Sequence, residues 1–280
     1  MDGAAAVEKE VADYWRTSII DMAPGRIAFR GVPVQDLIGE VSFPEMIWRM
    51  LRNDRPTREQ AWLLECALVA GVDHGPQAPS IAIARMAVTC GLPLNGAIAS
   101  AVNTLDDVHG GAGEQAVDLY LDIARREDAG ASFDAAVAAG LAAFRAQRGK
   151  FISGFGHRFH KPVDPRAPRL MACVAQAQAA GAASGRYAAI GQAIERLLAA
   201  QKGTAVPMNI DGATAVIYAE LGFEAPLARG LFCLSRSVGI LAHAWEQSQQ
   251  GGRNKGPTPK RFLFTYEPAS PADEGGHVES

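Results

Sequence analysis

The chain has 280 residues, of which 48% are hydrophobic and 20% charged, and its formal net charge at pH 7 is -3. A chain of this length buries a large core and fits one large domain, or a main domain with a smaller one inserted. The charge lacks the basic excess that is typical of nucleic-acid-binding proteins, so no nucleic acid partner is expected.

The first segment, Met1 to Arg16, is acidic and rich in alanine, and it lacks the charged start and apolar core of a secretory signal. We find no apolar run long enough to span a bilayer, so no membrane association is expected. The four cysteines lie far apart among apolar neighbours, which favours reduced core thiols over disulfides or a metal site. They are Cys66, Cys90, Cys173 and Cys233. We therefore expect a cytoplasmic protein.

A short strand is expected at 26–30, ahead of Gly31. Two helices follow it in the sequence. Ser42 and Thr57 each stand three residues before a Glu or a Gln, which is the spacing of a capping box. Pro44, in the first turn of the earlier helix, also favours a helix start. Apolar residues then recur at helical spacing, so both segments are predicted to be packed helices.

Helical periodicity and glycine or proline stops predict helix over most of the remaining chain. The expected helices are 79–90, 94–106, 114–127, 133–147, 169–180, 186–201, 212–221 and a last one from Pro226 to about Gly251. In the last helix an apolar stripe is expected to be buried against other helices or a second subunit. The stripe consists of Leu227, Leu231, Leu234, Val238, Leu241 and Trp245. A second strand is expected at 261–266, before a loose tail from Glu267 to Ser280.

Three breaks between the predicted helices each carry one titratable side chain. They are His109 before Gly110-Gly111, His157 after Gly154-Phe155-Gly156, and Asp211 after Asn209-Ile210. Carbon–carbon bond chemistry through an enolate needs such a set: one group moves a proton on carbon, one holds the enolate oxygen, and one moves a proton on the electrophile's oxygen. The glycines allow close approach of backbone to a ligand.

Each of these motifs also has a purely structural interpretation. His109 could cap the last carbonyls of the preceding helix, or donate a hydrogen bond to a thioester oxygen. The loop at 154–157 could be a solvated basic turn, or it could wrap a nucleotide-like group. Asp211 could be nothing more than the N-cap of the helix from 212.

Two further residues could bind an anionic substrate. His74, in Asp73-His74-Gly75-Pro76, could hydrogen-bond a carboxylate or hydroxyl, or only close a turn. Arg236 would offer a forked donor to a dicarboxylate or tricarboxylate if it faces a pocket; otherwise it would snorkel or pair with a core carboxylate. The spacing of Asp73, His74 and His109 is not typical of a metal site, and no metal is expected.

Taken in order, these motifs resemble those of the citrate synthase superfamily, from about Gly25 to Tyr266. The matching stretches are Arg30 to Leu37, Asp-His-Gly-Pro with His74, His-Gly-Gly-Ala with His109, Gly-Phe-Gly-His-Arg with His157, Asp164-Pro165-Arg166, Asn-Ile-Asp with Asp211, and Leu-Ser-Arg with Arg236. The short chain, Gly75-Pro76 and Gly212 are more similar to the citryl-CoA lyase branch, including the lyase module of ATP-citrate lyase, than to full synthases.

The resemblance implies an all-α, citrate synthase-like fold. Its large domain would contain residues 1–111 and 209–280, and its smaller, coenzyme A-side domain residues 112–208. It also implies a homodimer or higher homo-oligomer with sites between domains.

The resemblance also implies roles for individual residues. His109, His157 and Asp211 would be catalytic, and His74, Arg166 and Arg236 would bind the oxaloacetate portion. Gly154, Phe155, Gly156 and Arg158 would lie against coenzyme A. The implied partners are an acyl-CoA and an oxo-acid, with a coenzyme A thioester as substrate and no tightly bound cofactor.

The expected reaction is cleavage of citryl-CoA, or a close analogue, to acetyl-CoA and oxaloacetate through an enolate. In that direction His157 accepts the tertiary hydroxyl proton, His109 stabilises the enolate oxygen and Asp211 protonates the enolate carbon. One alternative is a citrate or 2-methylcitrate synthase that condenses an acyl-CoA with oxaloacetate. A second is a non-catalytic acyl-CoA-binding subunit that keeps the fold.

Overall fold

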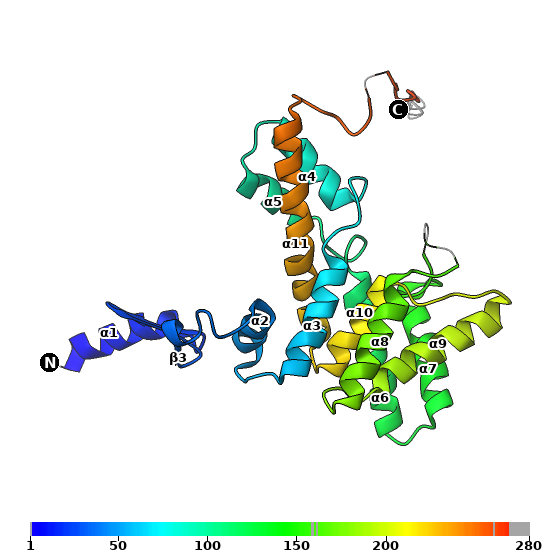
Figure 1. The fold of residues 1–280 in the computed structure, drawn as a ribbon, viewed down its shortest axis with the longest axis horizontal. Helices are drawn as coiled ribbons and strands as arrows, with labels where there is room; N and C mark the ends of the chain where they lie inside the picture. Colours follow the sequence, from blue (N-terminus) through cyan, green and yellow to red (C-terminus); the bar gives the residue numbers. More distant parts are fainter. Residues whose placement is uncertain (1, 158–159, 161, 260, 269–280) are drawn as a thin grey trace, which may run out of the picture. The chain divides into compact units, whose positions relative to one another are not determined.

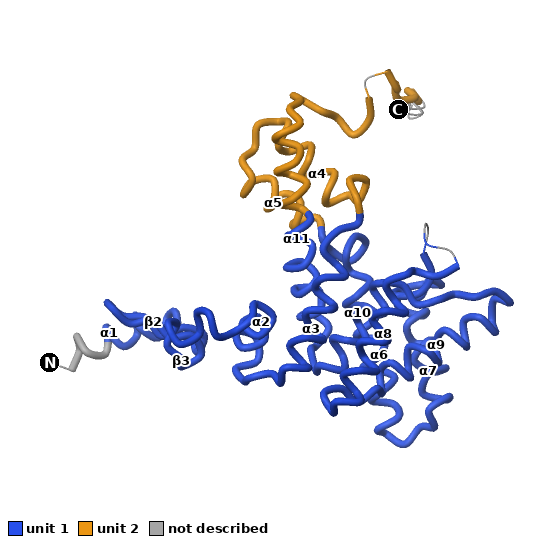
Figure 2. Tube along the Cα trace, viewed as in Figure 1, with its two compact units in different colours: residues 1–74, 105–239 blue, residues 75–104, 240–280 orange. Residues whose placement is uncertain are grey.

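The computed structural model describes residues 2–157, 160, 162–259 and 261–268 (Figure 1). Within these residues, eleven α-helices account for most of the ordered structure, and strands are short and few. The expected all-α fold class is thereby confirmed. The chain divides into two compact units (Figure 2). Unit 1 contains Met1–His74 and Leu105–Gly239, and unit 2 contains Gly75–Thr104 and Ile240–Ser280. The predicted division into 1–111 with 209–280 and 112–208 stays a prediction.

Unit 1 begins with α1 (Asp2–Tyr14), which the sequence analysis did not predict. A small antiparallel sheet follows, with strands in the order β1 (Ile20–Ala23), β2 (Arg26–Phe29) and β3 (Val32–Pro33). Ile20 pairs with Phe29, and Ala28 pairs with Pro33. The strand predicted at 26–30 is therefore present, as the centre of this sheet. A single 3-10 turn (Val34–Asp36) follows it.

Both predicted capping boxes are confirmed at the next two helices, α2 (Phe43–Arg52) and α3 (Arg58–Gly71). The Ser42 amide donates to Glu45 Oε2 at 2.8 Å, and the Glu45 amide donates back to Ser42 Oγ at 3.4 Å. Thr57 and Gln60 repeat this reciprocal pair. Each box satisfies two amides that the first helical turn leaves without a partner, and so fixes where the helix begins.

The helical core of unit 1 surrounds α10 (Ile210–Glu220). This helix packs against α3, α6 (Ala112–Asp128), α8 (Arg166–Ala179) and α9 (Arg186–Lys202), while α7 (Phe133–Arg148) packs on α6 and α9. Every residue of α10 from Gly212 to Ala219 is buried. A helix that is apolar on all sides has to be enclosed by others, and the small residues of α10 let its neighbours approach closely.

Unit 2 contains α4 (Pro79–Thr89) and α5 (Leu94–Val102), which pack on each other, and the second part of α11 (Ala225–Gln250). Arg85 of α4 donates to Glu246 and Gln250 of α11 at 2.6 and 2.7 Å. The strand predicted at 261–266 is wrong. Residues 261–268 form no strand, since they pair with no other described segment and expose their large apolar side chains.

The apolar stripe of α11 is only partly buried in this chain. Leu231 is 1% exposed, but Leu234, Val238, Leu241 and Trp245 are 43–59% exposed. The expectation that other helices of the chain cover these four residues is wrong. Burial against a second subunit, the alternative, stays a prediction.

By length and composition alone, α11 would be able to cross a membrane, contrary to the sequence expectation that no run is long enough. Core helices of water-soluble proteins also meet these criteria, so this is weak support for a membrane span. The helix also carries Arg229 and Arg236, which form ionic and polar contacts within unit 1.

All four cysteines are free thiols, as expected, but not all are core residues. Cys173 is buried, Cys66 and Cys233 are partly buried, and Cys90 is exposed. The prediction of a core thiol is therefore wrong for Cys90, which follows the last turn of α4.

Candidate active site

Backbone hydrogen bonds join the loop before His157 to the segment before Asp211. The Gly156 amide donates to Pro207 O at 2.7 Å, and the Asn209 amide donates to Gly154 O at 3.0 Å. Phe155 and Met208 form an antiparallel bridge between these bonds. The two motifs, more than fifty residues apart in sequence, are thus held side by side by main-chain atoms.

Two glycines make this close approach possible. A Cβ added to Gly212 would lie 2.3 Å from Gly154 O, and one added to Gly154 would lie 2.7 Å from the Gly212 Cα. Gly154 also has a φ of +87°, which residues with side chains rarely adopt. Both positions therefore require glycine for the two segments to stay in contact. The Tyr120 hydroxyl adds a hydrogen bond to Gly212 O at 3.2 Å.

Asn209, and not Asp211, is the N-cap of α10. Its Oδ1 accepts from the amides of Asp211 and Gly212 at 2.9 and 3.2 Å, and its Nδ2 donates to Gly156 O at 2.7 Å. The structural interpretation of Asp211 as a cap is therefore wrong, because the helix begins at Ile210. Asp211 lies in the first turn with its carboxyl group outside the cap.

The Asp211 carboxyl group has a raised pKa. Loss of solvation is the main cause, and the nearby Asp164 charge adds to it, while Arg236 and Arg166 act in the opposite direction. A carboxyl group whose pKa is moved toward neutral pH is suited to exchange a proton with carbon.

Asp164 connects the start of α8 to the start of α10. It is 1% exposed, and it accepts from Arg166 Nε and Nη2 at 3.0 and 2.9 Å and from the Ile210 amide at 3.2 Å. Burial alone would raise its pKa, but the bonds from Arg166 and Ile210 outweigh burial and lower the pKa to about 2. Asp164 therefore stays ionised and fixes the plane of the Arg166 guanidinium.

Three imidazole rings lie together beside this pair. The ring centroids of His74 and His157 are 5.4 Å apart, edge to face, and those of His157 and His160 are 4.5 Å apart. The His160 amide donates to His157 Nδ1 at 3.0 Å, so a neutral His157 ring carries its proton on Nε2. Burial is the main cause that lowers the pKa of both His74 and His157, and Arg166 lowers both further.

His109 lies in a tight loop between α5 and α6. The preceding helix ends at Val102 and not at 106, so His109 does not directly follow a helix as predicted. The Asp106 amide donates to His109 O at 2.9 Å, and Gly110 turns the chain with a φ of +103°. Burial, and secondarily the charge of Arg236, lower the pKa of His109. A neutral His109 ring is able to donate a hydrogen bond without carrying charge.

Arg236 is buried where α11 crosses the end of α3. It is 6% exposed, its Nε donates to Gly71 O at 3.0 Å, and its guanidinium lies 4.8 Å from the Phe232 ring centroid. Small residues form the crossing: a Cβ on Gly239 would lie 2.1 Å from Val72 O. The snorkelling interpretation is therefore wrong. Burial lowers the pKa of Arg236, while the charges of Asp211 and Asp73 raise it.

The structure brings the predicted catalytic and substrate-binding residues into one electrostatically connected group within unit 1. Arg236 influences the pKa of His74, His109 and Asp211. Arg166 influences the pKa of His74, His157 and Asp211. Of the three proposed catalytic groups, Asp211 is therefore influenced by both arginines, His109 by Arg236 and His157 by Arg166.

The structure describes three of the four residues that are predicted to lie against coenzyme A. Gly154 and Gly156 are at the contact with the 207–212 segment, and the Phe155 ring lies 6.5 Å from that of Tyr120. Arg158 lies outside the described residues. Contact of this loop with coenzyme A stays a prediction.

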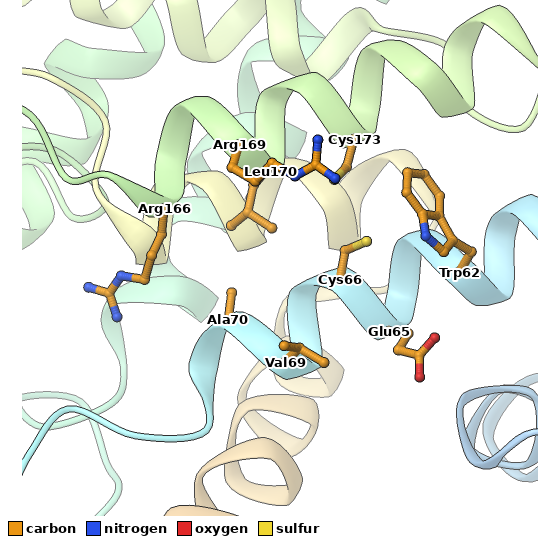
Figure 3. Close-up of a pocket in the computed structure, with 9 residues that line it drawn as sticks. All are labelled: Trp62, Glu65, Cys66, Val69, Ala70, Arg166, Arg169, Leu170 and Cys173. Carbon is orange, nitrogen blue, oxygen red and sulfur yellow. The ribbon is translucent and has the colours of Figure 1, made fainter.

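A pocket of about 350 Å³ lies between α3 and α8 (Figure 3). Arg166 is at one end with its guanidinium directed away from the thiols, and Arg169 extends toward Cys173. Burial and a hydrogen bond with Cys173 raise the pKa of the Cys66 thiol to about 12. The pocket shares Arg166 with the ionic group described above and differs from it in the protonated Cys66 thiol and the apolar residues beside it.

Among the described residues, His157, His160 and Asp164 bring possible metal-ligand atoms within 4.8 Å of one another. Both Asp164 oxygens already accept from Arg166, so a cation would have to displace that guanidinium. The donor set therefore fits a metal poorly.

Sequence reasoning did not anticipate what Asp164 and Arg229 do. Asp164 was noted only as part of a motif. Arg229 forms ion pairs with Asp106, Asp107 and Glu114, on both sides of His109. The acidic pair Asp106-Asp107, ahead of His109 in the same loop, was the available signal for a basic partner.

Together, these features describe a helical protein in which histidines, carboxyl groups and arginines form one group within unit 1. Residues 47–257 match the family described as "Citrate synthase, C-terminal domain". The chain therefore belongs to the citrate synthase family.

Relatives and solved structures agree with this assignment. The citrate synthase of Haloferax volcanii is 31% identical over 201 residues, which are 71% of this chain and 49% of that protein. The citrate/2-methylcitrate synthase of Bacillus subtilis is 30% identical over 218 residues, or 77% of this chain and 54% of that protein. The chain thus spans about half the length of the curated relatives it matches.

Among solved structures, citryl-CoA lyase from Hydrogenobacter thermophilus is similar with a TM-score of 0.79 and 28% identity, covering 92% of this chain and 96% of that one. ATP citrate lyase from Methanothrix soehngenii has a TM-score of 0.75 and 21% identity, covering 96% of this chain and 45% of that one. At that identity the second likeness indicates the fold alone.

Proposed function

We propose that this protein cleaves citryl-CoA, or a close analogue, to acetyl-CoA and oxaloacetate. The observation that carries the proposal is the similarity to a citryl-CoA lyase over nearly the full length of both chains. The match to the curated synthases covers only about half of their length. The coenzyme A thioester is the substrate, and the reaction needs no tightly bound cofactor.

Cleavage begins at the tertiary hydroxyl group of citryl-CoA. As the carbon–carbon bond breaks, the hydroxyl oxygen becomes the carbonyl of oxaloacetate and its proton passes to His157 Nε2. Since the neutral ring already carries a proton there, the ring first gives that proton to solvent water and reacts as the imidazolate, and the hydroxyl proton then restores the neutral ring. The His160 amide that donates to Nδ1 stabilises negative charge on the ring, and the positive charge of Arg166 lowers the pKa of His157. In the reverse direction the same Nε2–H donates to the oxaloacetate carbonyl.

The electron pair of the broken bond passes to the acetyl-CoA enolate. His109 is neutral because its pKa is lowered, and its ring N–H stabilises the enolate oxygen. Asp211, whose pKa is raised, gives its proton to the enolate carbon and so completes acetyl-CoA. In condensation the same carboxylate removes that proton, since the reverse reaction passes through the same transition state.

The oxaloacetate portion is bound by His74, Arg166 and Arg236. Arg166 is held in orientation by Asp164, which is the arrangement that forked recognition of a carboxylate needs. The loop Gly154 to Gly156, with Arg158, lies against coenzyme A. The predicted homo-oligomer and cytoplasmic location belong to the same proposal.

The second candidate is a citrate or 2-methylcitrate synthase. It is favoured by the names of the sequence relatives. It differs in the last step, because a synthase hydrolyses the thioester and releases free thiol.

Two incubations separate the candidates. In the first, citryl-CoA is supplied and acetyl-CoA and oxaloacetate are measured; in the second, acetyl-CoA and oxaloacetate are supplied and free thiol is measured. A lyase gives products in the first and no thiol in the second, whereas thiol release in the second identifies a synthase.

A protein inactive in both incubations is tested further with acetyl-CoA in deuterated water. If it binds coenzyme A calorimetrically but exchanges no methyl protons, it is a non-catalytic acyl-CoA-binding subunit.

A further inference from the structure

Arg229, on the side of α11 that faces α6, binds three carboxylates with its three guanidinium nitrogens. Nη1 pairs with Asp106, Nη2 with Asp107 and Nε with Glu114. Asp106 and Asp107 precede His109 in its loop, and Glu114 is in the first turn of α6 just after it. One cation therefore ties together the two ends of the segment that carries His109.

The same loop is fixed at further points. The Asp106 amide bonds to His109 O, and Gln115 Nε2 donates to Asp107 O at 3.0 Å. A Cβ on Gly111 would lie 2.7 Å from Asp107 O, so the turn is too tight for a side chain there. The loop is compact, with Arg229 supplying its side-chain anchor.

One face of α11 carries the contacts to this loop. Arg229, Phe232 and Arg236 are spaced three and four residues apart, so they lie on the same face of the helix. The Phe232 ring is 3.0 Å from where a Cβ of Gly110 would be. Arg236 is the charge that influences the His109 pKa. The helix thus contacts the loop before and after His109 and sets the charge near its ring.

The charges make Arg229 necessary for this arrangement. Without it, the three carboxylates would repel one another across the loop. Asp106 and Asp107 are 81% and 64% exposed, so their pairs alone are weak, but Glu114 and Arg229 are only 19% and 21% exposed. The Arg229–Glu114 pair is therefore the shielded part of the anchor.

We propose that Arg229 is a positioning residue that holds His109 against the substrate thioester. The proposal rests on the enolate-stabilising role of His109 given above. Arg229 itself touches no reacting atom; it acts through the backbone of the loop. Its loss is expected to lower kcat more than it raises the KM for citryl-CoA, because other residues bind the oxaloacetate portion.

The test uses Arg229→Met and Arg229→Lys, with Arg186→Met as the matched control. Arg186 also joins three acceptors in unit 1, namely Glu127, Asp128 and Ala124 O, and none of them is a proposed site residue. A displacement of about 1 Å at a catalytic group costs roughly 10²-fold in rate. We expect Arg229→Met to lose kcat on that order, Arg229→Lys to recover part of it, and Arg186→Met to stay within about twofold of wild type.

A second readout does not depend on activity. The ring resonances of His109 are followed by NMR against pH in the wild type and in the variants. In Arg229→Met the His109 pKa should rise toward its ordinary value, because an opened loop exposes the ring; in Arg186→Met it should not change. Asp107→Asn, which removes one exposed pair, gives a milder variant if Arg229→Met does not fold.

These readouts separate the two proposals. If the wild type is inactive on citryl-CoA but the His109 pKa still depends on Arg229, the function is wrong and the positioning is right. If Arg229→Met loses no more kcat than Arg186→Met at equal loss of thermal stability, and the His109 pKa does not move, the positioning proposal is overturned.

Discussion

The two histidine loops of unit 1 are anchored by different means. The His157 loop is joined to the Asp211 segment by main-chain hydrogen bonds and a glycine–glycine contact. The His109 loop is joined to α11 and α6 by the charges of Arg229 and its three carboxylates. The first anchor requires two residues without side chains, Gly154 and Gly212. The second anchor requires charged side chains. The two anchors should therefore fail under different perturbations.

The largest expected effect comes from replacing Asp211, which follows Asn209 in the segment held by main-chain hydrogen bonds. Asp211→Asn removes the proposed proton-transfer group, and such groups contribute about 10²–10⁴-fold in rate. We expect kcat to fall by that factor while coenzyme A binding, measured by calorimetry, is retained. Asp118→Asn is the matched control, because burial also raises the pKa of Asp118, which lies outside the candidate site. Near-normal turnover by Asp211→Asn would contradict the proposed role of Asp211 in proton transfer.

Gly212→Ala should break the main-chain anchor. The new Cβ would lie 2.3 Å from Gly154 O, and overpacking of this kind costs about 1–3 kcal/mol. Thermal unfolding should show that loss, and kcat should fall with it because the His157 loop is pushed away. Gly230→Ala, in α11 with open space around it, should instead gain up to about 1 kcal/mol of stability. Equal stability of the two variants would contradict the contact.

The pH dependence of the free energy of unfolding tests the contribution of Asp164. Its pKa in the folded chain is about 2, below the ordinary value of 3.8, so its stabilisation is complete above about pH 4 and is lost as the pH falls through 2. The shift corresponds to about 2 kcal/mol. Denaturant unfolding between pH 4 and 2 should show a steeper loss for the wild type than for Asp164→Asn. Parallel pH curves for the two proteins would rule out this contribution.

Salt should affect the two loops differently. Exposed ion pairs contribute about 0.2–1 kcal/mol and are screened at high ionic strength. Hydrogen exchange of the amides at 106–110 should therefore speed up on the order of two- to fivefold between low salt and 1 M salt. The amides of Gly156 and Asn209, which donate the two hydrogen bonds of the other anchor, should not respond. A uniform response of both loops would show that charge does not distinguish them.

Local signals made much of the fold predictable. The capping boxes at Ser42 and Thr57 fixed two helix starts, because all the atoms involved lie within four residues. The predicted helix 169–180 begins three residues after the observed start of α8 at Arg166, and Pro168 lies between the two starts. It is the third residue of the helix, where a missing amide costs little. The predicted strand at 261–266 failed because a strand needs a distant partner that its own alternation cannot supply.

The same distinction applies to the site. His74, His109, His157 and Asp211 were identified from short motifs, and the structure brings them together around two arginines. The anchor at Arg229 was not predictable, since its partners are 115–123 residues away in sequence and no local pattern specifies them. Asn209 took the capping position that had been assigned to Asp211, because the helix starts two residues earlier than the pattern indicated.

The contact between Gly154 and Gly212 has a consequence for engineering a new substrate range. Because both partners are main-chain atoms, a neighbouring side chain such as that of Val206 is open to randomisation without removing the contact itself. A library that varies either glycine would consist mostly of unproductive clones. Mutagenesis aimed at larger acyl groups should therefore keep these two positions fixed and diversify the residues around them.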